Sequence, residues 1–208
     1  MADRYDTSGN IEAQFEPGSD GRVLRNLLGI CDPAEMDDVE LGLFARLSMA
    51  IPGWVEPDQI LAVYDVMEWY RLWLQTVYTW AGRIRTVNLS KGNFTFTASR
   101  HLPQLLNTLD ATFLAVHTPC VGMEEDRLAE AIAIVLVELI LIHPFREGNG
   151  RIAGLLADVM SIQAGRPALD FTPWDADKNR YFAAIHAGLC DYAPMKELVK
   201  IALRASES

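Results

Sequence analysis

The sequence lacks the long apolar segments that mark membrane-spanning and secreted proteins. Its longest apolar run, 131–142, has twelve residues and contains Glu138. Because that length is too short to cross a bilayer, the run predicts a buried core helix instead. The first ten residues also lack the apolar stretch of a signal peptide. We therefore expect a cytoplasmic protein that does not bind membranes.

Cysteine and positive charge are scarce as well. The three cysteines, Cys31, Cys120 and Cys190, follow no CxxC or Cys/His pattern, which predicts ordinary thiols in a reducing compartment. The chain carries 18 basic and 28 acidic residues, a formal net charge of −10. This excess of negative charge repels nucleic acids and anionic membranes, and no stripe of basic residues offsets it. Any polyanion must therefore bind at a small local site.

The rest of the composition is that of one globular domain. With 208 residues, half of them hydrophobic, the chain is long enough to bury a core without disulfide bonds. Residues 1–22 mix Gly, Ser, Asp and Glu, so we expect an extended N-terminal arm there. We find no internal repeat and no linker. The sequence therefore predicts a single domain over 1–208.

The apolar spacing predicts an all-α fold with one β-hairpin. Helical periodicity covers the segments 33–49, 57–79, 100–116, 124–142, 149–164, 174–189 and 193–205. Asp32-Pro33 is a typical helix start, Pro103, Pro173 and Pro194 fit first turns, and Gly165 fits a helix exit. Between 83 and 99, apolar and polar residues alternate around Lys91-Gly92-Asn93, which indicates a hairpin.

The segment 138–160, ELILIHPFREGNGRIAGLLADVM, carries the chemistry. The residue before a proline is disfavoured in a helix, so the apolar helix should end at His143, where its ring can reach solvent. The small residues 148–150 then open a new helix, whose first N–H groups form an anion site. Arg151 lies in the first turn of that helix, and Glu147 is a natural Mg²⁺ ligand beside phosphates.

Each of these residues alone has a simpler explanation, since a lone histidine is usually a cap and Gly-Asn-Gly is usually a turn. Together, a base, a metal carboxylate, an oxyanion cradle and an arginine are the parts that phosphoryl or nucleotidyl transfer requires. Phe145, between them, is interpreted as a core residue.

At this point the sequence resembles a known family. HPFREGNGR at 143–151 is similar to the Fic (Fido-fold) signature HxFx(D/E)GNGRxxR and matches it at every specified position through Arg151. The segment 78–96, YTWAGRIRTVNLSKGNFTF, resembles the stretch leading into the hairpin "flap" of that family. The resemblance covers roughly 60–190 and implies the helical Fic core, with the flap at 83–99 and the active-site loop and helix start at 143–154.

The resemblance implies a protein adenylyltransferase that moves AMP from ATP to a Ser, Thr or Tyr hydroxyl of a target protein. His143 would be the general base, and Glu147 would hold Mg²⁺ between the α- and β-phosphates. Gly148, Asn149 and Gly150 would line the anion hole, and Arg151 would bind the departing pyrophosphate.

The resemblance also implies how partners dock. The target would add as a strand to the flap, where Lys91 orients it or instead contacts a phosphate. Tyr181 falls where the family often has an aromatic residue near the nucleotide, although a helix-core role explains it equally well. The resemblance also raises a small inhibitory antitoxin as a partner, and the sequence leaves open whether a separate one holds the enzyme inactive.

Two departures from the family pattern bear on specificity. The last arginine of the motif is replaced by Gly154, so the usual grip on the terminal phosphate is missing; Arg83, Arg85 and Arg100 are alternative sources of it. The inhibitory pattern [ST]xxxE[GN] is matched only in part, at 8–13. Two other functions stay open: transfer of another nucleotide, phosphocholine or phosphate on the same fold, and a catalytically silent peptide-binding module.

Overall fold

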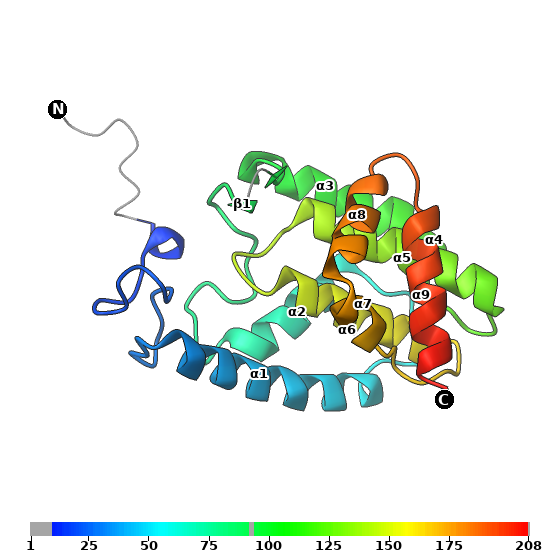
Figure 1. Cartoon of the computed structure of the whole chain (residues 1–208), viewed down its shortest axis with the longest axis horizontal. Coiled ribbons are helices and arrows are strands. Elements are labelled where there is room, and N and C mark those ends of the chain that lie inside the picture. Colours follow the sequence, from blue (N-terminus) through cyan, green and yellow to red (C-terminus); the bar gives the residue numbers. More distant parts are fainter. Residues whose placement is uncertain (1–9, 92–93, 208) are drawn as a thin grey trace.

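A computed structural model describes residues 10–91 and 94–207 and is mostly helical (Figure 1). The α-helices are α1 Pro33–Ala50, α2 Val63–Leu74, α3 Leu102–Thr108, α4 Ala115–His117, α5 Glu125–Ile142, α6 Asn149–Gln163, α7 Thr172–Ala176, α8 Lys178–Ala187 and α9 Ala193–Ala205. The strands are β1 Ser90–Lys91 and β2 Phe94–Thr95. Within the described residues, no helix is both long and apolar enough to cross a membrane. The architecture confirms the all-α prediction.

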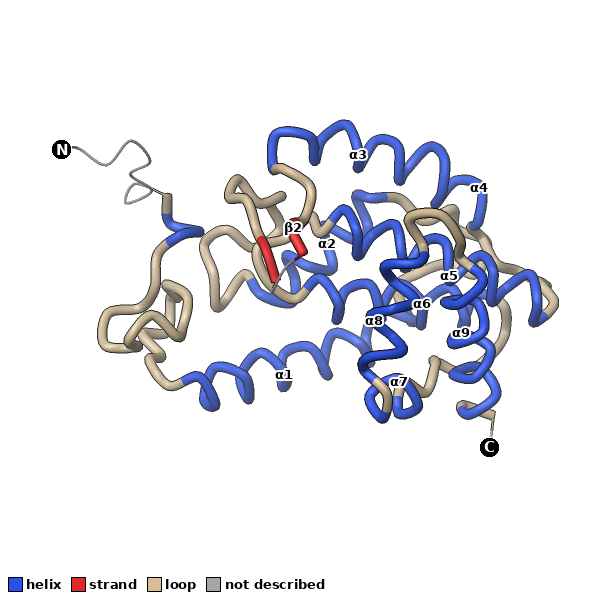
Figure 2. The backbone as a smooth tube through the Cα atoms, turned by 45° about the horizontal axis from the view of Figure 1, so that its top comes forward, coloured by secondary structure: helices blue, strands red, loops and turns tan. Residues whose placement is uncertain are grey.

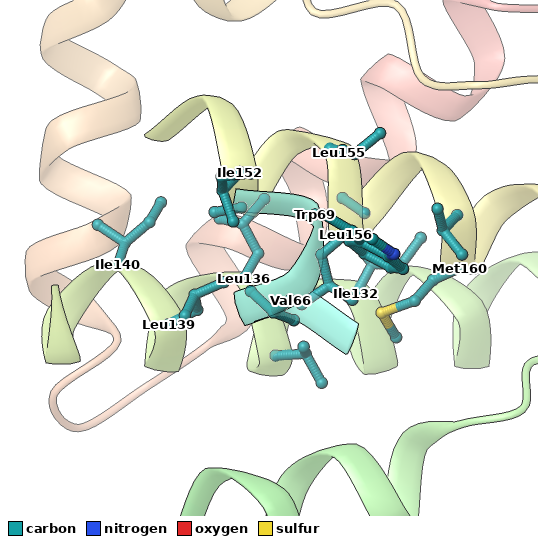
Figure 3. Packing of buried hydrophobic residues seen from close by; sticks show 14 of the residues in the cluster. Val66, Trp69, Ile132, Leu136, Leu139, Ile140, Ile152, Leu155, Leu156 and Met160 are labelled. Atoms are coloured by element: carbon teal, nitrogen blue, oxygen red, sulfur yellow. The ribbon is translucent and has the colours of Figure 1, made fainter. Parts of the chain in front are cut away.

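Helix α5 forms the centre of the core because apolar side chains surround it on all sides. It packs against α6 along one side and against α9 along another. Figure 3 shows Val66 and Trp69 of α2 lying over Ile132 of α5 and Leu156 of α6. Helix α1 runs along the edge of this bundle (Figures 1 and 2). The packing fixes the C-terminal end of α5 next to the N-terminal end of α6.

Several helix ends lie where local chemistry predicts them. Asp32 caps α1 by accepting a hydrogen bond from the backbone N–H of Glu35 at 3.0 Å, and Pro33 follows in the first turn. Helix α9 begins at Ala193 with Pro194 in its first turn, and Gly165 follows α6 with a φ of +82°. These boundaries confirm the capping signals of the sequence.

The predicted helix at 57–79 is shorter in the structure, where α2 covers only Val63–Leu74. Its N-terminus is fixed by two carboxylates. Asp65 accepts from the backbone N–H of Ala62 at 2.8 Å, and Asp110, from a distant segment, accepts from Val63 at 2.7 Å. The long-range contact from Asp110 explains why periodicity alone misplaced this boundary.

The predicted helix at 174–189 is broken into α7 and α8. Asp177 separates them with a φ of −135° and a ψ of 72°, and its carboxylate accepts from the backbone N–H of Arg180 at 3.0 Å. This capping bond restarts the helix, so α8 has its own N-terminus beside α6. The segment predicted as one helix at 100–116 is helical but irregular, with a π-helical stretch at Leu109–Leu114.

The hairpin is much shorter than the predicted 83–99. Its strands pair Ser90 with Thr95 and Lys91 with Phe94, and Gly92 and Asn93 lie outside the described residues. One further hydrogen bond joins the N–H of Phe96 to the carbonyl of Leu89 at 3.1 Å. Closer to the domain body, Ser99 joins the two legs: its N–H donates to Oδ1 of Asn88 and its hydroxyl to the carbonyl of Thr86, both at 2.9 Å.

The described part of the N-terminal arm, 10–22, differs from the predicted extended chain. It contains the 3₁₀ turn Ile11–Ala13, and an isolated bridge joins Phe15 to Leu24 just beyond it. Glu12 and Ser19 are buried. The composition of this arm predicted an extended chain, but Asn10 and Glu12 form hydrogen bonds to Thr86 on the body of the domain.

Candidate active site

His143 lies at the mouth of the core helix. It caps α5 in the left-handed conformation, with a φ of 52°, and its backbone N–H donates to the carbonyl of Leu139 at 3.0 Å. Its Nδ1 is 3.2 Å from the carbonyl oxygen of Ile140. Because that oxygen can only accept, Nδ1 is the donor in this contact. The nitrogen that can accept a proton is then Nε2.

The loop between α5 and α6 is closed by the side chain of Asn149. Its Oδ1 accepts from the backbone N–H of Phe145, and its Nδ2 donates to the carbonyl of Phe145, both at 2.9 Å. Phe145 is buried, as the sequence predicts, and stacks on Tyr70 with ring centroids 3.9 Å apart. The Asn149 side chain therefore holds the loop, which leaves only its backbone N–H for an anion hole.

The start of α6 has the geometry that suits an anion cradle. The first helical hydrogen bond runs from the N–H of Ile152 to the carbonyl of Gly148 at 3.1 Å, so the N–H groups of Asn149, Gly150 and Arg151 precede the helical ladder. Gly148 has a φ of +76°, and a Cβ atom there would lie 2.5 Å from the Trp73 ring. Only glycine fits this turn, which lets the loop approach the core closely.

Arg151 is held by a buried carboxylate that the sequence did not reveal. Its Nη2 lies 2.6 Å from Oε2 of Glu40, and the hydroxyl of Tyr78 donates to Oε1 of Glu40 at 2.8 Å. The guanidinium also lies over the Trp73 ring, 4.5 Å from its centroid. Glu40 comes from α1 and is 3% exposed. The arginine is thus oriented by the Glu40 carboxylate and the Trp73 ring, while about a third of its side chain stays accessible.

Glu147 is exposed beside this cradle. One of its carboxylate oxygens accepts from the N–H of Gly148 at 3.0 Å, and the side chain lines a hollow of about 200 Å³ with Asp37, Glu40 and Arg151. Among the residues that the structure describes, no group of three His, Cys, Asp or Glu side chains is arranged to hold a metal. A single accessible carboxylate suits Mg²⁺ that takes its other ligands from phosphates and water.

The flap covers His143. The ring of Phe96 stacks on the imidazole with centroids 3.6 Å apart, and Phe94 lies 4.9 Å from His186 of α8. These rings line a cavity of about 330 Å³ that reaches Gly150 and Tyr181. A pocket walled by aromatic side chains next to an anion cradle fits a planar base joined to phosphates.

Tyr181 lies between this cavity and a second one of about 450 Å³. Its ring stacks on Trp174 with centroids 5.2 Å apart, and burial raises the pKa of its hydroxyl well above the ordinary value. The second cavity is lined by Arg151, Gly154 and Asp158 along one face of α6. Burial raises the pKa of Asp158 to about 7, although its carboxylate accepts from the N–H of Leu169.

The structure thus brings together His143, Glu147, the cradle at 148–150, Arg151 and Tyr181. Lys91 lies in β1, but its side chain is outside the described part of the structure. Arg85, one of the alternative phosphate ligands, is buried and donates to backbone carbonyls. Sequence analysis missed Glu40, because a lone glutamate in a helix gives no sign that its partner lies on another one. It also missed Phe96, whose alternation with polar neighbours was a usable signal.

Comparison with known proteins places this geometry in a family. A model of the Fic/DOC family matches residues 60–161. A probable protein adenylyltransferase of Sinorhizobium fredii, y4lH, is 32% identical over 150 residues, which cover 72% of this chain and 74% of that protein. The chain belongs to the Fic/DOC family. Another family member, the protein adenylyltransferase VbhT of Bartonella schoenbuchensis, is 29% identical over 157 residues, but the matched region is 30% of its length.

Solved structures of Fic proteins share the fold. The structure of BepC from Bartonella tribocorum with bound AMPPNP superposes with a TM-score of 0.72 at 22% identity, covering 93% of this chain and 97% of that one. This agreement confirms the Fic helical core that the motif predicted. The residues of the Fic motif, 143–151, therefore lie in a fold that other family members also have.

Proposed function

We propose that this Fic-family chain is a protein nucleotidyltransferase that moves AMP from ATP to a Ser, Thr or Tyr hydroxyl of a target protein. One observation carries the proposal. A histidine at the C-terminus of α5, with its acceptor nitrogen defined by Ile140, lies on the same loop as the N–H cradle of α6. Relatives of this family are named protein adenylyltransferases.

His143 acts as the general base. Its Nε2 takes the proton of the target hydroxyl, whose oxygen then forms a bond to the α-phosphorus of ATP. The bond between that phosphorus and the oxygen bridging to the β-phosphate breaks, and pyrophosphate leaves. The N–H groups of Asn149, Gly150 and Arg151 stabilise the negative charge on the phosphates, and the Arg151 guanidinium binds the leaving group.

Glu147 is the residue that would hold Mg²⁺. It is exposed, whereas Glu40 in the same hollow is already engaged by Arg151 and Tyr78. When bound, Mg²⁺ would neutralise phosphate charge and align the phosphates. The hydrogen bond from the Gly148 N–H at 3.0 Å holds one oxygen of Glu147, whose side chain lines the hollow.

Target proteins dock on the flap as an added strand. In the described part of the hairpin, two strands pair only with each other, so each keeps an outer edge of N–H and C=O groups near the His143 pocket. Phe94 and Phe96 of this hairpin line the same pocket as His143, so an added strand would run close to the base. Lys91 orients that strand.

The experiment incubates the purified protein with labelled ATP and Mg²⁺ and a cell lysate, followed by intact-mass analysis of modified proteins. A shift by the mass of one AMP residue supports the proposal. A different added mass indicates transfer of another nucleotide, phosphocholine or phosphate. No modification, combined with retained peptide binding at the flap, indicates a silent binding module.

A further inference from the structure

Arg85 makes an unusual set of contacts for a buried cation. Its side chain is 1% exposed, and its three guanidinium nitrogens donate to three backbone carbonyls. Nε donates to His143 at 2.7 Å, Nη1 to Val87 at 2.7 Å and Nη2 to Thr97 at 2.6 Å. Its backbone N–H donates to the carbonyl of Pro144 at 2.8 Å. One residue therefore joins the loop that carries the base to both legs of the flap.

The strands themselves do not provide this connection. Their pairing is limited to Ser90 with Thr95 and Lys91 with Phe94, followed by one bond between Phe96 and Leu89. Closer to the domain body, the Arg85 guanidinium bridges the carbonyls of Val87 and Thr97, one on each leg. Ser99 adds two bonds between the legs, from its N–H to Asn88 and from its hydroxyl to the carbonyl of Thr86. A planar guanidinium suits this role because its donors point in fixed directions.

Glu12 supplies the opposing charge. It is 6% exposed, and its carboxylate accepts from the backbone N–H of Thr86, next to Arg85, at 2.7 Å. Burial lowers the pKa of Arg85, and the charge of Glu12 acts in the opposite direction. Arg146 of the active-site loop holds the arm in place by donating to the backbone carbonyl of Glu12 at 2.7 Å.

We propose that Arg85 is a positioning residue that fixes His143 and the target-docking flap as one unit. It holds the His143 backbone, while the imidazole stacks under Phe96 at 3.6 Å between centroids. A hydroxyl presented by a strand added to the flap then arrives at a constant position relative to Nε2. This inference rests on the proposed function, because the alignment matters only if the flap docks the group that His143 deprotonates.

The test compares Arg85→Lys with Arg127→Lys, a control whose side chain is exposed near the N-terminus of α5, the end opposite His143. A lysine at 85 keeps the charge but cannot reach three diverging carbonyls. We expect amide hydrogen exchange across 86–98 to rise about tenfold or more, because charge-assisted bonds are lost there. We expect kcat for target modification to fall about 10- to 100-fold while the Kd for ATP changes little. The control should match the parent in amide exchange across 86–98, in kcat and in the Kd for ATP.

Parental exchange and parental kcat in folded Arg85→Lys would overturn the inference and assign Arg85 to packing alone. If that variant does not fold, Glu12→Gln replaces it, because it removes the counter-charge and leaves Arg85 in place. Faster exchange across 86–98 with a lower kcat is again expected, and parental values would refute the proposal. Hydrogen exchange needs no substrate, so a parent that transfers nothing would refute the proposed function while exchange still decides whether Arg85 anchors the flap.

Discussion

Replacement of Gly154 by arginine tests how this protein recognises the end of its nucleotide. Gly154 lies one turn after Arg151 and lines the cavity of about 450 Å³. A Cβ atom added there would lie 3.6 Å from Cε2 and Cζ of the Phe171 ring, which is ordinary van der Waals contact. The longer side chain would then extend into the cavity. The structure therefore predicts that Gly154→Arg folds, and the gain in helix propensity contributes about 0.5–1 kcal/mol.

The expected gain in ATP affinity follows from the contact that an arginine at position 154 would make with the terminal phosphate. A hydrogen bond between charged groups contributes about 1.5–3 kcal/mol, which corresponds to a tenfold or larger change in affinity. Asp158 opposes this effect, because it lines the same cavity four residues further along the helix. An arginine paired with that carboxylate would lower its pKa from about 7 instead of binding phosphate.

Calorimetric titration of ATP and ADP into the parent, Gly154→Arg and the uncharged control Gly154→Met separates these outcomes. We expect the parent and the methionine variant to bind both nucleotides within about threefold, and the arginine variant to prefer ATP by about tenfold or more. A parent that already prefers ATP by more than about tenfold would refute the reasoning, since another group would then contact the terminal phosphate. Equal affinities in the arginine variant would place the new side chain on Asp158.

Four further substitutions test the other parts of the site. His143→Ala should lower transfer about 10²- to 10⁴-fold with ATP affinity retained, measured by rate assay and calorimetry; more than about a tenth of the parental rate would exclude a base role. Glu147→Gln should abolish transfer and flatten the Mg²⁺ titration, whereas a parental titration with a lower Tm would make Glu147 a loop cap. Lys91→Ala should slow target modification more than it weakens ATP binding, and equal losses would make Lys91 a phosphate ligand. Glu40→Gln should lower the free energy of unfolding by about 1–3 kcal/mol in urea titration, reduced from the fully buried case because Arg151 is 32% exposed; unchanged stability would show that the pair is not stabilising.

Local chemistry in the sequence determined several of the helix ends and the turn between α5 and α6. Asp32 and Pro194 mark helix starts because a capping carboxylate and a proline act within one turn, and the structure confirms both. Pro144 predicts the end of α5 because it restricts the residue before it, and His143 is indeed non-helical. The small residues 148–150 predict the N–H cradle at the start of α6, because they shape only the backbone of the turn in which they lie.

Only the tertiary structure decided what depends on contacts between distant segments. Asp110 sets the start of α2 from 47 residues away, and no periodicity in 57–79 contains that information. Glu40 reaches Arg151 across 111 residues, and Arg85 reaches His143 across 58. A buried charge must find its partner wherever the folded chain brings one, so neighbouring residues in the sequence cannot indicate which partner that is.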